Sequence, residues 1–178
     1  MTMAAFDGKV ALVTGAGGGI GFATAEAFAR SGASVILADS DAEMIGKAAE
    51  RLCATGHNAI GVTCDVTDTA QITAMIERAV STYGRLDAAF NNAGVNSEAA
   101  ALLETSDNEF ERVMNVNLRG VWNCMKGELR QMMAQGSGAD CQLFFDRRLK
   151  GFQRTQRLFC EQTRGDRSDA ERRSRLCH

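Results

Sequence analysis

Several patterns that mark particular protein classes are missing from this chain of 178 residues. No run of residues is long and apolar enough to span a bilayer. The cysteines form no CxxC pair and only two histidines accompany them, so we expect no metal site. The chain has no proline, which is unusual for a domain of this size. Its net charge of -2 gives no reason to expect a nucleic acid or a membrane as a partner.

The beginning of the chain, MTMAAFDGKVALVTG, has no charged segment ahead of an apolar one, as a signal peptide would. We therefore interpret the six cysteines as reduced thiols of a cytoplasmic protein. A composition of 45% hydrophobic and 24% charged residues is typical of one soluble globular domain with a core.

Charge is divided unevenly along the chain. Residues 1–139 contain 10 Lys+Arg and 16 Asp+Glu, whereas residues 140–178 contain 10 Lys+Arg and only 6 Asp+Glu. Such asymmetry usually marks a tail. We therefore predict a folded domain over 1–139 followed by an aberrant basic tail over 140–178, which we expect to be disordered.

The folded part alternates apolar strands with helical stretches that end at glycine. Strands are predicted over 9–15, 33–39, 58–66 and 86–94, and helices over 19–32, 41–56, 68–84 and most of 105–136. Asp68 or Thr69 caps the third helix, and Met125, Met132 and Met133 are expected to face the core. This alternation predicts an α/β fold, a Rossmann-like doubly wound parallel sheet with strand order 3-2-1-4.

A glycine turn, TGAGGGIG, lies between the first strand and the first helix. Its spacing is T-G-x-x-x-G-x-G and not GxGxxG, because Ile20 stands where the latter needs glycine. Glycines let backbone N–H groups approach a pyrophosphate at the positive end of a helix. A tight turn without a ligand is the alternative, but the flanking strand and helix favour phosphate binding.

Asp39 ends the second strand, about twenty residues after the glycine turn. A carboxylate there can accept hydrogen bonds from adenosine ribose hydroxyls and would repel a 2′-phosphate. No Arg or Lys lies beside it or in the glycine turn, so the sequence favours NAD over NADP. Alternatively, Asp39 is a surface residue that caps the helix beginning near Asp41.

Four motifs in order, TGAGGGIG, CDVTD, NNAG and NVNLRG, resemble those of the short-chain dehydrogenase/reductase family. The similarity covers roughly residues 6–139. It implies an oxidoreductase that transfers hydride between NAD(H) and the CH–OH group of a small-molecule alcohol or the corresponding carbonyl, in relatives that form homo-oligomers. It implies the following cofactor-binding residues: Thr14, Gly15, Gly19, Ile20, Gly21, Asp39, Asp65, Val66, Asn92, Ala93 and Gly94.

The resemblance also implies that Asp65 and Val66 border the adenine ring and that NNAG forms the middle of the cofactor pocket. Asn117 would be the active-site asparagine, which kinks its helix and holds a water in a proton relay. Each residue has a simpler interpretation: Asp65 as a helix cap, NNAG as a turn, and Asn117 as a solvated helix residue. The four motifs in register favour the functional interpretation.

The family's acid/base is a tyrosine in Y-x-x-x-K, with a serine thirteen residues earlier that polarises the carbonyl. The only tyrosine here is Tyr83, at the end of the third helix. Residues 140–178 contain no tyrosine and one lysine, Lys150. Asn117 is therefore the only surviving member of the catalytic set, and we expect this chain to be truncated and inactive.

A frameshift would explain the tail. With one extra nucleotide after the codon for Ala139, synonymous codons for DCQLFFD and the residues after it can be read one base later. That frame yields a strand of the type IVN-SS and then Y-x-x-x-K, with serine thirteen codons before the tyrosine. The C-terminal half of the sheet would be missing from the printed frame, and the fourth strand would expose an edge.

Two other functions are compatible with the sequence. Residues 1–139 could form a non-catalytic NAD-binding module. The tail could be a basic arm for nucleic acid, but its arginines are interspersed with acids and few aromatics. The substrate cannot be read, because in this family the loops after the tyrosine helix choose it.

Overall fold

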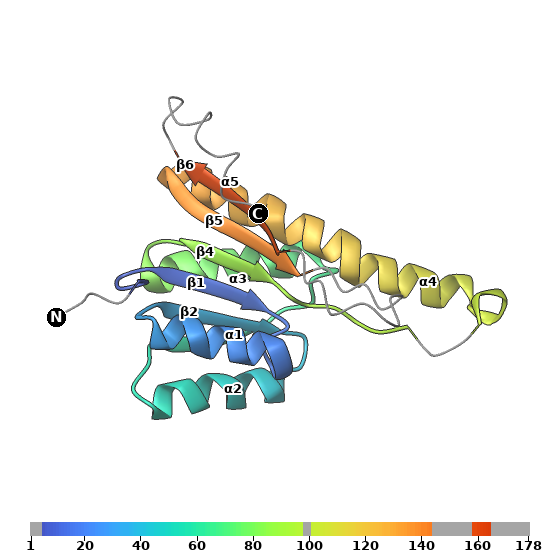
Figure 1. Cartoon of the computed structure of the whole chain (residues 1–178), viewed down its shortest axis with the longest axis horizontal. Coiled ribbons are helices and arrows are strands. Elements are labelled where there is room, and N and C mark those ends of the chain that lie inside the picture. The colour runs from blue at the N-terminus through green and yellow to red at the C-terminus, as the bar shows by residue number, and fades with distance from the viewer. Residues whose placement is uncertain (1–4, 98–100, 144–157, 165–178) are drawn as a thin grey trace.

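Strands and helices alternate along the chain in a computed structural model, which describes residues 5–97, 101–143 and 158–164 (Figure 1). The strands are β1 (Val10–Thr14), β2 (Ser34–Asp39), β3 (Ala59–Thr63), β4 (Ala88–Asn91), β5 (Ser137–Leu143) and β6 (Leu158–Arg164). The helices are α1 (Gly19–Arg30), α2 (Ala42–Ala54), α3 (Thr69–Tyr83), α4 (Asp107–Met114) and α5 (Val121–Gln135), with a 3-10 turn, η1 (Leu102–Glu104), and a π-helical turn, η2 (Asn115–Gly120).

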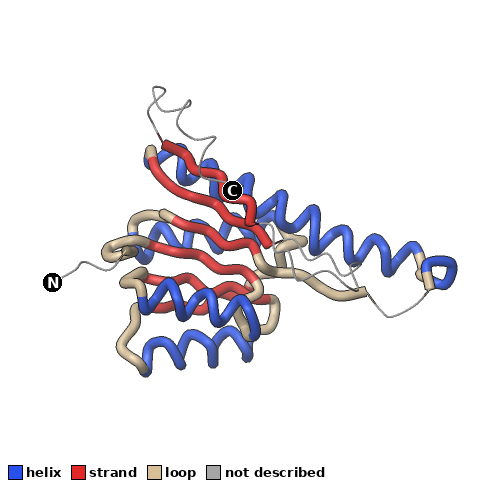
Figure 2. Tube along the Cα trace, viewed as in Figure 1, coloured by secondary structure: helices blue, strands red, loops and turns tan. Residues whose placement is uncertain are grey.

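The strands form one sheet in the order β3-β2-β1-β4-β5-β6 (Figure 2). The first five are parallel and β6 is antiparallel to β5. The predicted order 3-2-1-4 and the Rossmann-like class are confirmed. The exposed edge predicted for β4 is wrong, because Ala88–Asn91 pairs with residues 139–142 of β5. Of the predicted tail, residues 144–157 and 165–178 lie outside the described residues.

Helices cover both faces of the sheet, as the doubly wound topology requires. On one face Ala11 and Val13 of β1 pack with apolar residues of α1 and α2. On the other face Val10 and Leu12 pack with apolar residues of α3 and α5. Alternate residues of one strand therefore serve two cores, which explains why β1 is buried at every position.

Side-chain caps define where several helices begin. Asp41 accepts hydrogen bonds from the N–H groups of Glu43 and Met44 at the start of α2. Asp68, and not Thr69, is the N-cap of α3. The α3 helix ends at Gly84, whose φ of 79° places it in the left-handed region.

The long predicted helix over 105–136 is two α-helices joined by η2. Met132 is fully buried and Met125 is partly buried, but Met133 is 70% exposed, so its predicted core position is wrong. Adjacent residues point about 100° apart around a helix axis, and only one of the pair 132 and 133 can face the sheet.

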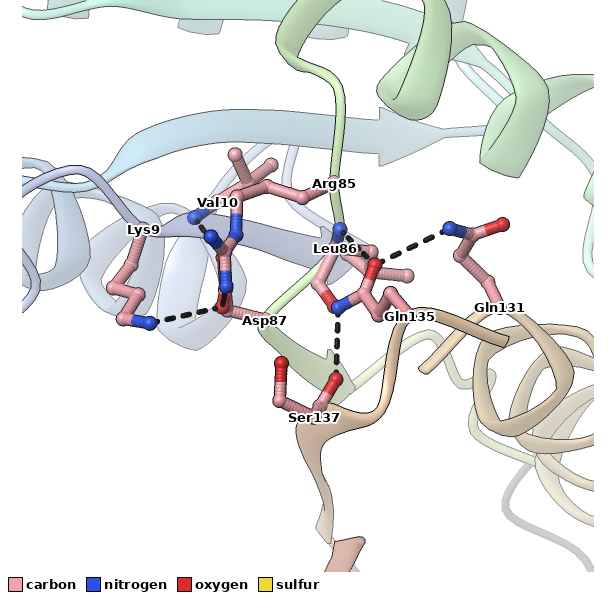
Figure 3. A network of polar contacts seen from close by, with 8 residues as sticks. All are labelled: Lys9, Val10, Arg85, Leu86, Asp87, Gln131, Gln135 and Ser137. Atoms are coloured by element: carbon pink, nitrogen blue, oxygen red, sulfur yellow. Dashed lines mark hydrogen bonds and ion pairs between the residues drawn. The ribbon is translucent and has the colours of Figure 1, made fainter. Parts of the chain in front are cut away.

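Polar contacts tie the strands together where β1, β4 and β5 begin (Figure 3). The Asp87 carboxylate accepts hydrogen bonds from the Val10 N–H at 3.0 Å, from Lys9 Nζ at 3.2 Å and from Arg85 Nε at 2.6 Å. Nearby, the Gln135 amide accepts from the Leu86 N–H at 3.1 Å and donates to the Leu86 carbonyl oxygen. These contacts lie at the amino ends of the strands, at the opposite end of β1 and β4 from Thr14 and Asn91.

Candidate functional site

The glycine turn brings backbone from two parts of the fold into direct contact. Gly15 has a φ of +63°, in the left-handed region that glycine favours. A Cβ on Gly21 would lie 2.0 Å from the carbonyl oxygen of Gly15, and a Cβ on Gly15 would lie 2.8 Å from Ala93 Cα. No side chain caps α1 and its first turn has no acidic residue. The turn therefore leaves backbone N–H groups at a helix N-terminus available to an anion.

The NNAG turn is bonded to the end of β1. Thr14 Oγ1 accepts hydrogen bonds from the backbone N–H groups of Asn92 and Ala93, each at 3.1 Å. Asn92 Nδ2 donates to the carbonyl oxygens of Thr14 and Gly15, at 3.2 and 3.1 Å. Four of the predicted residues are thereby joined, and NNAG is more than a turn because it holds the glycine turn in place.

Asp39 binds the glycine turn and the start of the next helix at once. Its Oδ2 accepts from the Gly17 N–H at 2.9 Å, and its Oδ1 accepts from the Asp41 N–H at 3.1 Å. The N-cap of α2 is Asp41 itself, so the alternative interpretation of Asp39 as that cap is wrong. Asp39 lies in the wall of a cleft at the carboxyl ends of the strands.

A cleft of about 590 Å³ opens where β1, β2, β3 and β4 end. The predicted residues in its wall are Gly15, Asp39, Asp65, Val66, Ala93 and Gly94. Val95 also lines it, as the resemblance implied for the segment that follows NNAG. Sequence reasoning missed the other lining residues, which are Ser40, Cys64, Thr67, Arg112, Asn115, Val116 and Arg119. The last four of these lie close together on α4 and η2, at helical spacings around Val116 of the NVNLRG motif, and that spacing could have identified them.

Six predicted residues do not line the cleft: Thr14, Gly19, Ile20, Gly21, Asn92 and Asn117. Thr14, Gly21 and Asn92 support its wall through the contacts above. Gly19 begins α1 with a φ of +55°, and the Ile20 side chain is 42% exposed. Within the glycine turn, Gly15 therefore lines the cleft and Gly21 packs behind it.

Asp65 does not cap α3, so that alternative is wrong. Its Oδ1 accepts hydrogen bonds from the N–H and the hydroxyl of Thr67, both at 2.8 Å, and these shape the loop between β3 and α3. Val66 is buried against Gly120 of η2, where a Cβ would lie 2.7 Å from Val66 Cγ2. Val66 therefore packs the β3 end of the cleft against the π-helical turn.

Asn117 lies in the π-helical turn, where the resemblance implied a kink. Its Oδ1 accepts from the Val95 N–H at 2.8 Å, and its Nδ2 donates to the Val95 carbonyl oxygen at 2.9 Å. The side chain is therefore bonded to the segment after NNAG and is not simply solvated. Its role in a proton relay stays a prediction.

Cys64 is the buried thiol of the cleft wall. Burial, and then the negative charges of Asp65, Asp68 and Glu128, raise its pKa to about 11. The thiol is thus protonated at neutral pH and is a poor nucleophile.

No helix in the described part of the chain is long and apolar enough to cross a membrane.

A parallel sheet with a cleft at the carboxyl ends of its strands, bordered by a glycine turn and an acidic strand end, defines a dinucleotide-binding class of domain. The sequence profile described as short chain dehydrogenase matches residues 9–139. The chain therefore belongs to the short-chain dehydrogenase family.

Curated relatives agree with this assignment. Oxidoreductase UcpA of Escherichia coli K12 is 43% identical over 136 residues, which cover 76% of this chain and 51% of UcpA. Cyclohexanol dehydrogenase of Acinetobacter sp. strain SE19 is 40% identical over 134 residues, which cover 75% of this chain and 53% of that enzyme. The chain spans about half the length of the curated relatives it matches.

Solved structures share the fold. A short chain dehydrogenase/reductase from Burkholderia phymatum in complex with NAD superposes with a TM-score of 0.71 at 38% identity, covering 76% of this chain and 47% of that one. A short-chain type dehydrogenase/reductase from Mycobacterium marinum gives a TM-score of 0.72 at 32% identity, covering 76% and 56%.

Proposed function

We propose that the folded part of this chain binds NAD and is the cofactor-binding part of an oxidoreductase that acts on alcohols and carbonyls. One arrangement carries the proposal: Gly15 of the glycine turn and Asp39 lie in the wall of the same cleft. The backbone of Gly15 and Gly21 is so close that any side chain would fill the cradle, as expected for a turn that approaches a pyrophosphate. The solved relative from B. phymatum is in complex with NAD.

The charge of Asp39 in the cleft wall supports NAD as the cofactor rather than NADP. Asp39 would accept hydrogen bonds from ribose hydroxyls and repel a 2′-phosphate. Arg112 lines the same cleft, but it is paired with Glu109 through two hydrogen bonds of 2.8 Å and donates to the Asn96 carbonyl oxygen. Its charge is therefore already compensated.

Calorimetric titration of the 178-residue chain with NAD and with NADP tests this choice. We expect NAD to bind more tightly, and Asp39→Ser to reduce the preference by about tenfold, since it removes the charge repulsion and replaces two carboxylate oxygens with one hydroxyl. Asp7→Ser removes a carboxylate from an exposed position and should leave both affinities unchanged. Equal affinity of the wild-type chain for both dinucleotides would contradict the assignment, and no binding of either would remove the proposed function.

A bound nicotinamide supplies the hydride acceptor or donor of the reaction. This chain holds Asn117 against Val95 beside the cleft but offers no tyrosine there. Tyr83 ends α3 and packs against the core, and burial, followed by the charge of Cys53, raises the pKa of its phenol above the usual value. A phenol in that position, harder to deprotonate than usual, cannot serve as the base.

We therefore expect this chain to be inactive as a dehydrogenase. NADH absorbance is followed with the purified chain, NAD and a panel of alcohols that includes cyclohexanol, the substrate in the name of one relative. Alcohol-dependent formation of NADH by this chain would refute inactivity. If the chain binds NAD without turnover, the alternative function, a non-catalytic NAD-binding module, describes it.

The frameshift hypothesis explains the missing tyrosine. It is tested by sequencing genomic DNA and transcript across the codons for residues 135–178. If an extra base after the codon for Ala139 is found only in the original read, the protein is a catalytically complete dehydrogenase. If the base is in the genome, the locus encodes this chain as printed. Absence of a frame that encodes Y-x-x-x-K would end the hypothesis.

Association between copies is the remaining expectation about partners. Exposed apolar side chains follow one another along α4, η2 and α5: Phe110, Leu118, Trp122 and Met133. These support contact between copies through these helices, as the resemblance implies for longer relatives. We expect this chain to associate more weakly than they do, because the tyrosine helix that completes their interface is missing from its sequence. Sedimentation velocity of the chain beside UcpA measures the difference.

A further inference from the structure

A carboxyl group lies fully buried beneath the cleft. Glu128 of α5 is 0% exposed, in a layer where apolar residues of α3 and α5 pack on the sheet. Its Oε2 accepts a hydrogen bond of 2.8 Å from Nδ2 of Asn91, which is 1% exposed. Burial of a carboxyl group is unfavourable unless the group is hydrogen-bonded, so its place in the core requires this contact or others like it.

Asn91 is the last residue of β4 and the first of the NNAG turn. In the parallel pairing it lies beside Thr14, the last residue of β1. The two residues that follow Asn91 donate to Thr14, and Asn92 also donates to Gly15. Glu128 therefore holds one end of a hydrogen-bonded series that reaches the glycine turn.

Neither Glu128 nor Asn91 lines the cleft. Any effect of the pair on a ligand must pass through the NNAG backbone. The Cys64 thiol, which follows β3, is close enough to Glu128 for the negative charge of Glu128 to raise its pKa, as the charges of Asp65 and Asp68 also do. The pair thus joins α5 to the site in a region where further negative charge is unfavourable.

We propose that Glu128 is a positioning residue for the dinucleotide site. Its carboxylate orients Asn91 and so sets the position of NNAG relative to the glycine turn. The inference rests on the proposed NAD binding for one of its two readouts. It predicts that NAD affinity depends on a matched hydrogen-bond donor and acceptor at residues 91 and 128, whichever of the two residues donates, and not only on burial of the pair.

The test compares Asn91→Asp, Glu128→Gln and the double variant in the full chain. Glu128→Gln keeps an acceptor oxygen and should bind NAD within about threefold of wild type. Asn91→Asp places two carboxyl groups in contact, so we expect NAD affinity to fall by about tenfold near neutral pH and to recover in acid, where the pair shares a proton. The double variant reverses donor and acceptor and should restore affinity and a flat pH profile.

Glu111→Gln, on the exposed surface of α4, is the matched control and should change nothing. If Asn91→Asp does not fold, Glu128→Ala replaces it, and we expect weakened NAD binding that Glu128→Gln does not show. If the pair only stabilises the fold, Asn91→Asp will lower the urea midpoint while the folded fraction keeps its NAD affinity. That result would overturn the proposal. Loss of affinity in Asn91→Asp without recovery in the double variant would overturn it too.

A second readout separates this inference from the proposed function. Amide hydrogen exchange is measured over residues 14–22 without NAD. Faster exchange in Asn91→Asp, reversed in the double variant, supports the positioning role even if the wild-type chain binds no NAD. Exchange that is unchanged in every variant overturns it, whatever the chain binds.

Discussion

Substitution of Gly21 by alanine should weaken both cofactor binding and the stability of the fold. A Cβ there would lie 2.0 Å from the Gly15 carbonyl oxygen and 2.8 Å from Asn92 Nδ2. Real Cβ atoms essentially never come within 3.0 Å of such atoms, so the backbone of the turn must shift by about 1 Å. The atoms in the way are the backbone of the glycine turn and the side chain that holds NNAG to it.

Overpacking of this kind typically destabilises by about 1–3 kcal/mol. If that energy opposes the conformation that binds NAD, affinity falls roughly 5- to 150-fold. Calorimetry measures the affinity, and urea unfolding measures the stability of the same sample. Both are expected to fall for Gly21→Ala.

Gly46→Ala is the matched control, because Gly46 also lies in a helix and a Cβ there meets nothing within 4 Å. Alanine is favoured over glycine in helices by up to about 1 kcal/mol, so the control should be as stable as wild type or more so, with unchanged NAD affinity. The reasoning would be refuted if Gly21→Ala bound NAD like wild type, or if Gly46→Ala lost as much affinity.

Two further predictions concern the polar contacts at the other end of the strands (Figure 3). Burial alone would raise the pKa of Asp87, but hydrogen bonds from Arg85, the Val10 N–H and Lys9 outweigh it and lower the pKa. The stability that Asp87 contributes is therefore present above the unfolded pKa of about 3.9 and is lost as pH falls through the lower folded pKa. Asp87→Asn should destabilise the chain by about 2 kcal/mol at pH 7 and flatten the acid limb of a urea-midpoint profile; an unchanged limb would contradict this. Gln135→Ala leaves the backbone of the buried Leu86 without its side-chain partner and should lower the free energy of unfolding in urea by about 1–3 kcal/mol. Gln131→Ala removes a partner of Gln135 only and should lower it by less.

The sequence was sufficient for the first four strands, their order and the helices between them. Apolar runs, glycine stops and aspartate caps are local signals, and each coincides with a described element. The pairing of β4 with β5 was missed because residues 140–143, DCQL, do not form an apolar run like those of the earlier strands. Whether a segment pairs as a strand depends on the neighbouring strand, which is distant in the sequence, and a local residue pattern does not contain that information.

The cleft was predicted in part for a related reason. Its glycine turn and acidic strand ends are motifs in the sequence, but Arg112 and Arg119 reach the cleft from α4 and η2. The link between Asn91 and Glu128 spans 37 positions and has no sequence signature. Such contacts arise from the packing of α5 on the sheet, which only the three-dimensional structure reveals.

The Asp87 contacts and the NNAG contacts lie at opposite ends of β1 and β4. The two ends of a five-residue strand such as β1 are about 16 Å apart. Effects of substitutions this far apart are usually additive. Stability and NAD affinity can therefore be changed independently in this chain. If substitutions near Thr14 alter NAD affinity and also destabilise the fold, stabilising substitutions around Asp87 should restore the stability without changing that affinity.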